Sequence, residues 1–172
     1  MLLCIGYSNS LHSQLFEPFD VRYQNAQKGG IRFLSNVAIS CSSGNCSSLQ
    51  SQMPPSGNGA NDNQNMQYVD IDSDFSTFMS TSDSLDLENC SEILWAGLYW
   101  SGEISTGTQG YAQRDQVKLS VNSDPYQDIT ADETIDISGI SHPSYNCFKD
   151  ITGIVQNAGI KARFTIANVL AR

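Results

Sequence analysis

The chain has 172 residues, which is enough for one domain with a hydrophobic core. Its formal net charge of −9 argues against binding to nucleic-acid phosphates or anionic membrane surfaces, because both would repel it. Only 16% of its residues are charged, whereas serine, threonine, asparagine and glutamine are abundant, as is common among extracellular β-proteins.

An apolar run at residues 1–7, followed by polar residues up to Ser13, is typical of the end of a signal peptide. The sequence therefore predicts a signal-peptide remnant at 1–13 and a single β-domain over 14–172. An ordinary N-terminal strand is the alternative for the apolar run, which is too short to span a bilayer. We expect a secreted protein with no membrane insertion, truncated at its C-terminal end and continuing into further domains.

Four cysteines remain when Cys4 is removed with the signal peptide, and an even number favours disulfides in an oxidising compartment. Four cysteines allow three pairings. Their spacing favours a local Cys41–Cys46 bridge and a long-range Cys90–Cys147 bridge. A zinc site is the rival interpretation, but no Cys-x-x-Cys or histidine spacing supports it.

The first half of the chain alternates between strand patterns and polar loops. Residues 31–40 predict a first strand, and the alternating residues 66–72 predict a second. Between them lies a long serine-rich loop at 41–62. The densest apolar run, 93–100, is apolar at both odd and even positions. It predicts a central strand covered on both faces, with both tryptophans in the core.

The second half adds more strands and one helix. Strands are predicted at 117–121, 126–130, 135–140 and 163–170, the first two forming a hairpin. A helix is predicted near 150–158, with Asp150 as its N-cap residue and Gly159 at its end. The fold class expected is all-β: an antiparallel, jelly-roll-like β-sandwich with this one short helix.

Four segments carry a family resemblance, namely 61–74, 95–100, 117–119 and 145–152. In this order they resemble the N-terminal β-sandwich region of large, repeat-bearing, adhesin-like cell-surface proteins of Bacteroidetes. Such proteins are often secreted by the type IX system and sometimes linked to gliding motility. The resemblance covers about 14–172. It implies a location on the bacterial outer surface and an adhesive role, and its recurrent cysteines match Cys90 and Cys147.

Three carboxylates, those of Asp70, Asp72 and Asp74, occupy alternate positions where the second strand ends. Calcium prefers six to eight oxygen ligands, and Asp62 and Asn63 lie just upstream. These five residues form the predicted calcium site, although their spacing is not that of an EF-hand. A solvated acidic surface is the alternative. Calcium is the one cofactor expected.

No pattern for catalysis is visible. The two histidines, His12 and His142, have no nucleophile motif beside them. Asp132 and Glu133 would point to opposite sides of a strand, which is unfavourable for a glycosidase pair, and a more distant carboxylate such as Asp128 stays a candidate. We therefore expect a non-enzymatic domain, with a secreted hydrolase fragment as the third interpretation.

The function expected is adhesion or module display on a bacterial surface, with calcium stabilising the domain. Its partner would be a cell-surface or extracellular polymer, either glycan or protein. A carbohydrate-binding module is the alternative, because aromatic rings can form a stacking platform for sugars. Tyr111 lies in a loop and is therefore the aromatic residue expected to be free for a ligand.

Overall fold

The structure is a computed structural model that describes residues 20–43, 46, 65–137, 139 and 143–171. Its strands are β1 (Ile39–Ser43), β2 (Asn65–Tyr68), β3 (Ser80–Asp86), β4 (Gly97–Glu103), β5 (Gln116–Val121), β6 (Gln127–Thr130), β7 (Glu133–Ile137), β8 (Ser144–Asp150) and β9 (Lys161–Ala167). The helices described are the 3-10 helix η2 (Tyr111–Gln113) and the α-helix α2 (Thr152–Ala158). All strand pairs are antiparallel, so the predicted all-β class with one short α-helix is confirmed.

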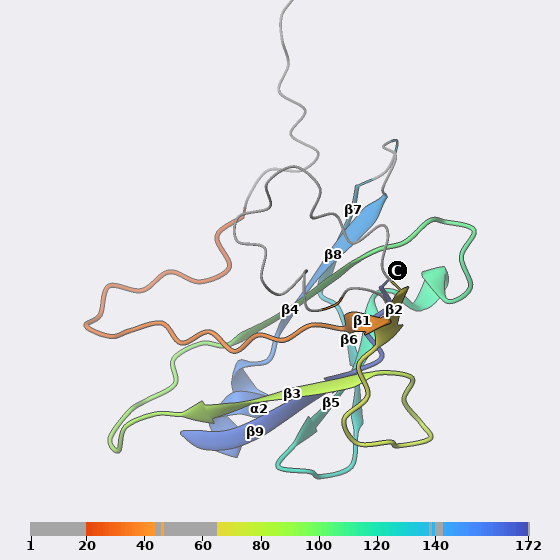
Figure 1. The fold of residues 1–172 in the computed structure, drawn as a ribbon. Coiled ribbons are helices and arrows are strands. Elements are labelled where there is room, and N and C mark those ends of the chain that lie inside the picture. The colour runs from red at the N-terminus through yellow and green to blue at the C-terminus, as the bar shows by residue number, and fades with distance from the viewer. Residues whose placement is uncertain (1–19, 44–45, 47–64, 138, 140–142, 172) are drawn as a thin grey trace, which may run out of the picture.

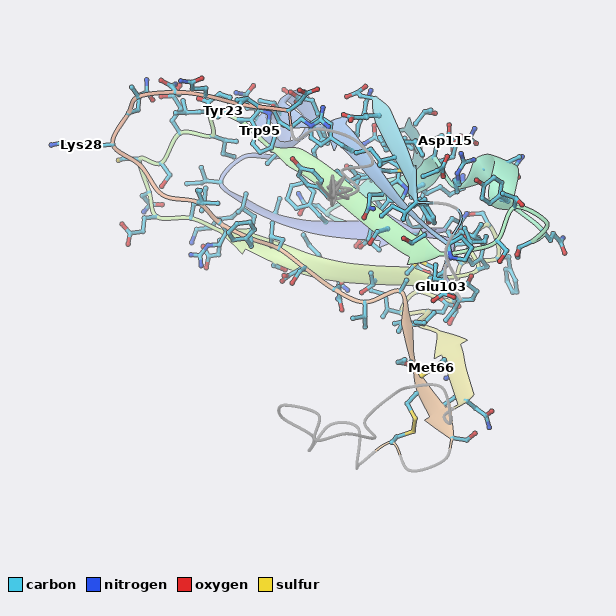
Figure 2. The ribbon with its side chains drawn as sticks, turned by 90° about the horizontal axis from the view of Figure 1, so that it is seen from above. Tyr23, Lys28, Met66, Trp95, Glu103 and Asp115 are labelled. Atoms are coloured by element: carbon cyan, nitrogen blue, oxygen red, sulfur yellow. A yellow bond between two sulfur atoms is a disulfide. The ribbon has the colours of Figure 1, made fainter. Side chains whose placement is uncertain are left out.

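Two sheets form a sandwich. One has the strand order β3-β9-β5-β6 and the other β4-β8-β7 (Figure 1). Seen from above, the two sheets form layers, and the separate β1–β2 hairpin projects away from them at Met66 (Figure 2). The hydrophobic core lies between the layers, since buried residues of both sheets belong to one cluster.

The core residues occupy alternate positions along the strands. In β5, Val117 and Leu119 are buried, and Val117 is paired in register with buried Ile129 of β6, as predicted for this hairpin. In the other sheet, Trp100 of β4 is opposite Cys147 of β8, and both are buried. The hydrophobic core is therefore built from one face of each sheet.

The run predicted as a central strand differs from the prediction. Strand β4 begins only at Gly97 and has a single partner, β8, among the described strands, so it is an edge strand. Ala96 instead contacts the start of the helix, since its carbonyl accepts from the Ile151 N–H and its N–H donates to Thr152 Oγ1. The central strand of this sheet is β8, which the sequence did not predict.

The predicted first strand is also shorter. Residues 31–37 form no strand and are exposed, and β1 begins at Ile39. Strand β3 was missed because its sequence is polar. It is nevertheless paired along its whole length with β9.

The helix is close to its prediction. Its N-cap residue is Ile151 rather than Asp150, although the Asp150 carboxylate accepts from the Thr152 N–H at 2.9 Å. Gly159, at a φ of +84°, ends it as predicted. The expected signal-peptide remnant lies outside the described residues. Within the described part of the chain, no helix has the length and apolar character needed to cross a membrane.

Candidate functional site

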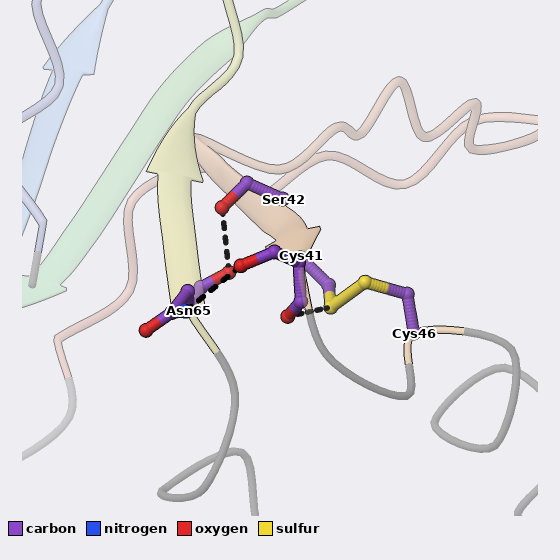
Figure 3. The surroundings of a disulfide bond; sticks show 5 residues. Cys41, Ser42, Cys46 and Asn65 are labelled. Carbon is purple, nitrogen blue, oxygen red and sulfur yellow. Dashed lines mark hydrogen bonds between the residues drawn. A yellow bond between two sulfur atoms is a disulfide. The ribbon is translucent and has the colours of Figure 1, made fainter.

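The Cys41–Cys46 bridge is confirmed, with the two Cα atoms 5.7 Å apart (Figure 3). The bridge links Cys41, within β1, to Cys46, shortly after the end of this strand. The neighbouring residues join β1 to β2, since Ser42 Oγ donates to the Asn65 carbonyl at 2.9 Å and Asn65 Nδ2 donates to Ser43 Oγ at 2.8 Å. These hydrogen bonds hold the two strands of the projecting hairpin together, and the bridge adds a covalent constraint at the end of β1.

The predicted Cys90–Cys147 bridge is wrong, because both cysteines are free. Cys90 is exposed, in a turn before β4, whereas Cys147 is buried in the core. The thiol of Cys147 lies 3.4 Å from Thr134 Oγ1 and donates to the Arg114 carbonyl at 3.7 Å. Burial raises the pKa of this thiol. The spacing could not reveal that the two side chains point to different environments.

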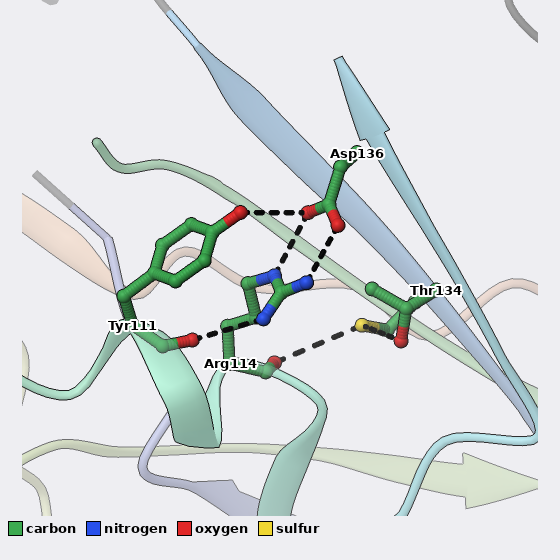
Figure 4. Close-up of polar contacts among 5 residues, drawn as sticks. Tyr111, Arg114, Thr134 and Asp136 are labelled. Carbon is green, nitrogen blue, oxygen red and sulfur yellow. Dashed lines mark hydrogen bonds and ion pairs between the residues drawn. The ribbon is translucent and has the colours of Figure 1, made fainter. Parts of the chain in front are cut away.

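A polar cluster of Tyr111, Arg114 and Asp136 joins η2 to β7 (Figure 4). Two Arg114 nitrogens donate to the Asp136 carboxylate at 2.8 and 2.5 Å, and the guanidinium lies 4.2 Å from the centre of the Tyr111 ring. Hydrogen bonding from Arg114 lowers the pKa of Asp136. The Arg114 carbonyl also accepts from buried Trp100 Nε1 at 3.0 Å. This cluster holds the loop before β5 against the β4-β8-β7 sheet.

The sequence predicted that Tyr111 would be free to bind a ligand, and the structure contradicts this prediction. The Tyr111 ring is half-buried against the core, and its hydroxyl donates to Asp136 at 3.5 Å. A ligand could stack on Tyr111 only after displacing Arg114 from its ring.

The three aspartates of the predicted calcium site lie in the turn between β2 and β3. Asp70 Oδ1 and Asp72 Oδ1 both accept from the hydroxyl of buried Ser80, at 3.1 and 2.9 Å. Asp74 instead accepts from the Ser76 N–H at 2.7 Å. Asp62 and Asn63 lie outside the described residues. Within the residues described, no group of three or more His, Cys, Asp or Glu side chains has the arrangement of a metal site.

Tyr126, which precedes β6, hydrogen-bonds through its hydroxyl to Asp72 Oδ2. Partial burial raises the pKa of Asp72, but the hydrogen bonds from Tyr126, the Asp74 N–H and Ser80 outweigh it, so the pKa is lowered. Burial and the same hydrogen bond raise the pKa of Tyr126. The acidic turn is thus attached to the sandwich at two separate points.

The carboxylates considered for hydrolysis each pair with a basic side chain. Asp132 accepts from Lys149 at 2.6 Å, and Asp128 accepts from Lys118 at 2.8 Å. Glu133 pairs with Arg22. Both histidines lie outside the described residues.

An aromatic row lies on the outer face of the β4-β8-β7 sheet. We define the row as Trp95, Tyr99 and Phe148. Tyr99 and Phe148 are register partners with ring centres 5.0 Å apart, and Trp95 stacks on Phe148 at 6.2 Å. Trp95, predicted to be a core residue, is only half-buried here, whereas Trp100 is in the core as predicted.

Residues before β1 cover part of this row. The Tyr23 ring stacks on Trp95 at 5.8 Å and an interplanar angle of 16°. The Arg22 guanidinium lies 4.8 Å above the Phe148 ring and pairs with Glu133. The sequence reasoning missed Tyr23, Arg22 and Phe148. For Phe148, the available signal was the alternation of Tyr145 and Cys147 along an unpredicted strand, which leaves Phe148 on the opposite face.

A pocket of about 220 Å³ lies at the start of strand β5, in the other sheet. Its lining is mixed, with two large apolar side chains and several amides and charges. The lining residues are Phe78, Gly110, Gln113, Gln116, Val117, Lys118, Asp128, Asn168 and Leu170. Its polar groups come from four different segments of the chain.

Fold and site together define a β-sandwich domain with an aromatic surface on one sheet. Compared with protein-family models, curated proteins and solved structures, the chain matches none of them.

Proposed function

We propose that this chain is a non-catalytic extracellular domain of a large bacterial surface protein, acting in adhesion or in the display of other modules. The aromatic row carries the proposal. Tyr99 is 58% exposed beside Phe148 and Trp95, on the outer face of a sandwich whose packed core holds the rings in place. Amphipathic aromatic side chains of this kind are enriched where proteins bind partners. The Cys41–Cys46 bridge supports an oxidising location.

The resemblance to the N-terminal region of adhesin-like Bacteroidetes proteins supports the same proposal. It favours a domain on the outer cell surface, exported by the type IX route and followed by further domains of the same chain. The partner would be an extracellular or cell-surface polymer, because a row of rings along a sheet face suits an extended molecule.

A carbohydrate-binding module is the second candidate, and one observation favours it. The Tyr23 ring lies parallel to Trp95, so one face of this indole accommodates a flat ring. A pyranose ring could stack there in the place of Tyr23, once Tyr23 has been displaced from the indole. Binding to polysaccharides but not to proteins would distinguish this candidate from general adhesion.

Binding of the immobilised chain to a panel of polysaccharides and extracellular matrix proteins tests the proposal. Tyr99→Ala should weaken binding by tenfold or more, since a tyrosine at the centre of an interface is a typical hot spot and contributes about 2 kcal/mol or more. Phe75→Ala is the matched control, because Phe75 is fully exposed in the turn between β2 and β3. Equal losses in both variants, or no binding to any polymer, would overturn the proposal.

Calcium stabilisation is proposed for the acidic turn. The single Ser80 hydroxyl carries one proton for two carboxylate oxygens, those of Asp70 and Asp72, and a divalent cation would relieve their repulsion. The melting temperature should rise by several degrees with calcium, and Asp72→Ala should abolish the rise. A melting temperature that chelator and calcium both leave unchanged would rule out a structural ion.

A further inference from the structure

The sandwich has four edge strands among the described residues, namely β3 and β6 in one sheet and β4 and β7 in the other. An edge strand leaves a row of backbone N–H and carbonyl groups without a partner in its sheet, and another extended chain can pair with them. Folded proteins usually block such edges with charged side chains, short strands or a covering segment. The four edges of this chain differ in how well they are blocked.

Three of these edges are blocked. Strand β3 is covered by residues that precede β1, since the Ser35 N–H donates to the Asp83 carboxylate at 3.3 Å and Asn36 Nδ2 donates to the Ser82 carbonyl at 2.9 Å. Strand β6 is only four residues long, which gives an added strand little to pair with. Strand β7 carries two carboxylates among its five residues.

Strand β4 has none of these protections. It is seven residues long, contains no proline and no basic residue, and carries one acidic residue, at its end. Tyr99 is 58% exposed, and Ser101 is exposed as well. Among the described strands, only β8 pairs with β4. One long side of β4 is therefore open to another chain.

The hydrogen bonds at the two ends of β4 show which of its backbone groups point toward β8. The Ile151 N–H donates to the Ala96 carbonyl at 3.0 Å, and the Ile104 N–H donates to the Pro143 carbonyl at 2.8 Å. The register between these two bonds is unbroken. In an antiparallel pair, the backbone groups of successive residues point alternately toward the partner strand and away from it. The even-numbered residues of β4 therefore face β8.

The odd-numbered residues of β4 direct their backbone groups to the open side. They include Gly97, Tyr99 and Ser101. Within the described part of the chain, no hydrogen bond occupies the N–H or carbonyl groups of these three residues. The open side thus presents donors and acceptors at the two-residue spacing of a β-ladder.

We propose that the open edge of β4 binds an extended, cationic segment of a partner protein as an added β-strand. A polypeptide backbone matches donors and acceptors at this spacing, whereas a sugar chain has no backbone amides to do so. The net charge of −9 attracts a cationic segment and repels an acidic one. The inference rests on the proposed function, for which it selects a protein partner rather than a polysaccharide.

The aromatic row adds side-chain contacts at this edge. Tyr99 and Phe148 are register partners whose ring centres lie 5.0 Å apart on the outer face. A residue of the added strand opposite Tyr99 extends this line of neighbours across the sheet. Cross-strand contacts between aromatic and β-branched side chains are favourable, so valine, isoleucine or an aromatic residue suits this position.

The probe is a synthetic peptide of alternating valine and threonine with a lysine at each end and blocked termini. Added to the isotope-labelled full chain, it should shift the amide NMR signals of Gly97, Tyr99 and Ser101 saturably. Hydrogen exchange at these amides should slow at least about tenfold at saturation. The same peptide with glutamate in place of lysine should bind at least about threefold more weakly.

Ser101→Pro tests the edge itself. Its N–H points away from β8, so proline keeps the β4–β8 pairing while it removes a donor and places its ring in the path of the added strand. Peptide binding should weaken at least about tenfold. Ser101→Ala is the matched control, because it keeps the N–H, and it should bind the peptide like wild type.

Equal peptide binding by folded Ser101→Pro and Ser101→Ala would overturn the inference, as would the absence of any shift at this edge. If Ser101→Pro does not fold, wild type is titrated instead with the same peptide N-methylated at every residue. Equal binding of the methylated and unmethylated peptides would also overturn it. Shifts of the same amides that follow the concentration of the chain alone, with no response to peptide, would assign the edge to a second copy and reject the inference.

The polymer panel separates this inference from the proposed function. If Ser101→Pro binds an extracellular polymer as tightly as wild type does, the adhesive function stands and strand addition alone is rejected. If no polymer is bound but the peptide still adds at Tyr99 and Ser101, the edge site stands and the proposed function alone is rejected.

Discussion

Gly102 of β4 lies where the segment after β9 crosses the sheet, and its replacement by alanine tests that packing. A Cβ atom at this position would lie 2.2 Å from the Leu170 carbonyl oxygen and 3.1 Å from the Tyr145 ring. Because real Cβ contacts are essentially never below 3.0 Å, the carbonyl must move by at least 0.8 Å (3.0 − 2.2). The same carbonyl accepts from the buried Tyr145 hydroxyl at 2.7 Å, so the movement also breaks that hydrogen bond.

Overpacking costs about 1–3 kcal/mol and an unsatisfied buried polar group about 1–3 kcal/mol, so Gly102→Ala should lose roughly 2–6 kcal/mol. For a chain of this size, that lowers the melting temperature by about 4–24 °C. Gly153→Ala in α2 is the matched control, because its Cβ would meet nothing within 4 Å. It should gain about 0.5–1 kcal/mol of helix stability. Equal melting temperatures for Gly102→Ala and wild type would refute this packing.

Three further predictions concern the cysteines and the polar cluster. Alkylation of the native chain followed by mass mapping should label Cys90 and leave Cys147 unlabelled until denaturant is added, because Cys147 is buried with a raised pKa; equal labelling would contradict its burial. The Cys41→Ser/Cys46→Ser double variant should speed amide exchange in the β1–β2 hairpin while changing the melting temperature of the separate sandwich little; a large loss of melting temperature would contradict that separation. The hydrogen bond from Arg114 lowers the pKa of Asp136, so the stability that this carboxylate contributes is present above about pH 4 and is lost as the pH falls through its lower value in the folded chain. Asp136→Asn should therefore be less stable than wild type at pH 7, by about 1 kcal/mol, and should lose less stability than wild type on acidification. Equal acid sensitivity of the variant and wild type would contradict the Arg114–Asp136 pairing.

Local patterns predicted those elements in which alternation and turn chemistry agree. The β5–β6 hairpin followed from residues 117–121 and a turn composed of Asn, Ser, Asp and Pro. The end of α2 followed from Gly159, whose positive φ suits glycine. The Cys41–Cys46 bridge followed from sequence proximity alone, because closing a short loop costs little conformational entropy.

Patterns misled where a residue's partner is distant in sequence. The polar strand β3 is stable because it pairs with β9, about eighty residues away. The pattern of the run before Gly97 predicts a buried strand. The backbone N–H and carbonyl of Ala96, at the end of this run, instead hydrogen-bond to Thr152 and Ile151 at the start of the helix. Composition cannot reveal such long-range pairing, since hydrogen-bond partners are assigned only when the sheets assemble.

The sequence by itself determined the all-β class, the short helix and the local disulfide, because these follow from periodicity, capping and proximity along the chain. The tertiary structure alone decided which aromatic rings are accessible. It placed Tyr111 beneath Arg114 and left Tyr99 exposed, the reverse of what their sequence contexts indicated. It also separated Cys90 from Cys147. The physical reason is that exposure and pairing depend on which faces of the two sheets meet, and only the folded chain fixes that choice.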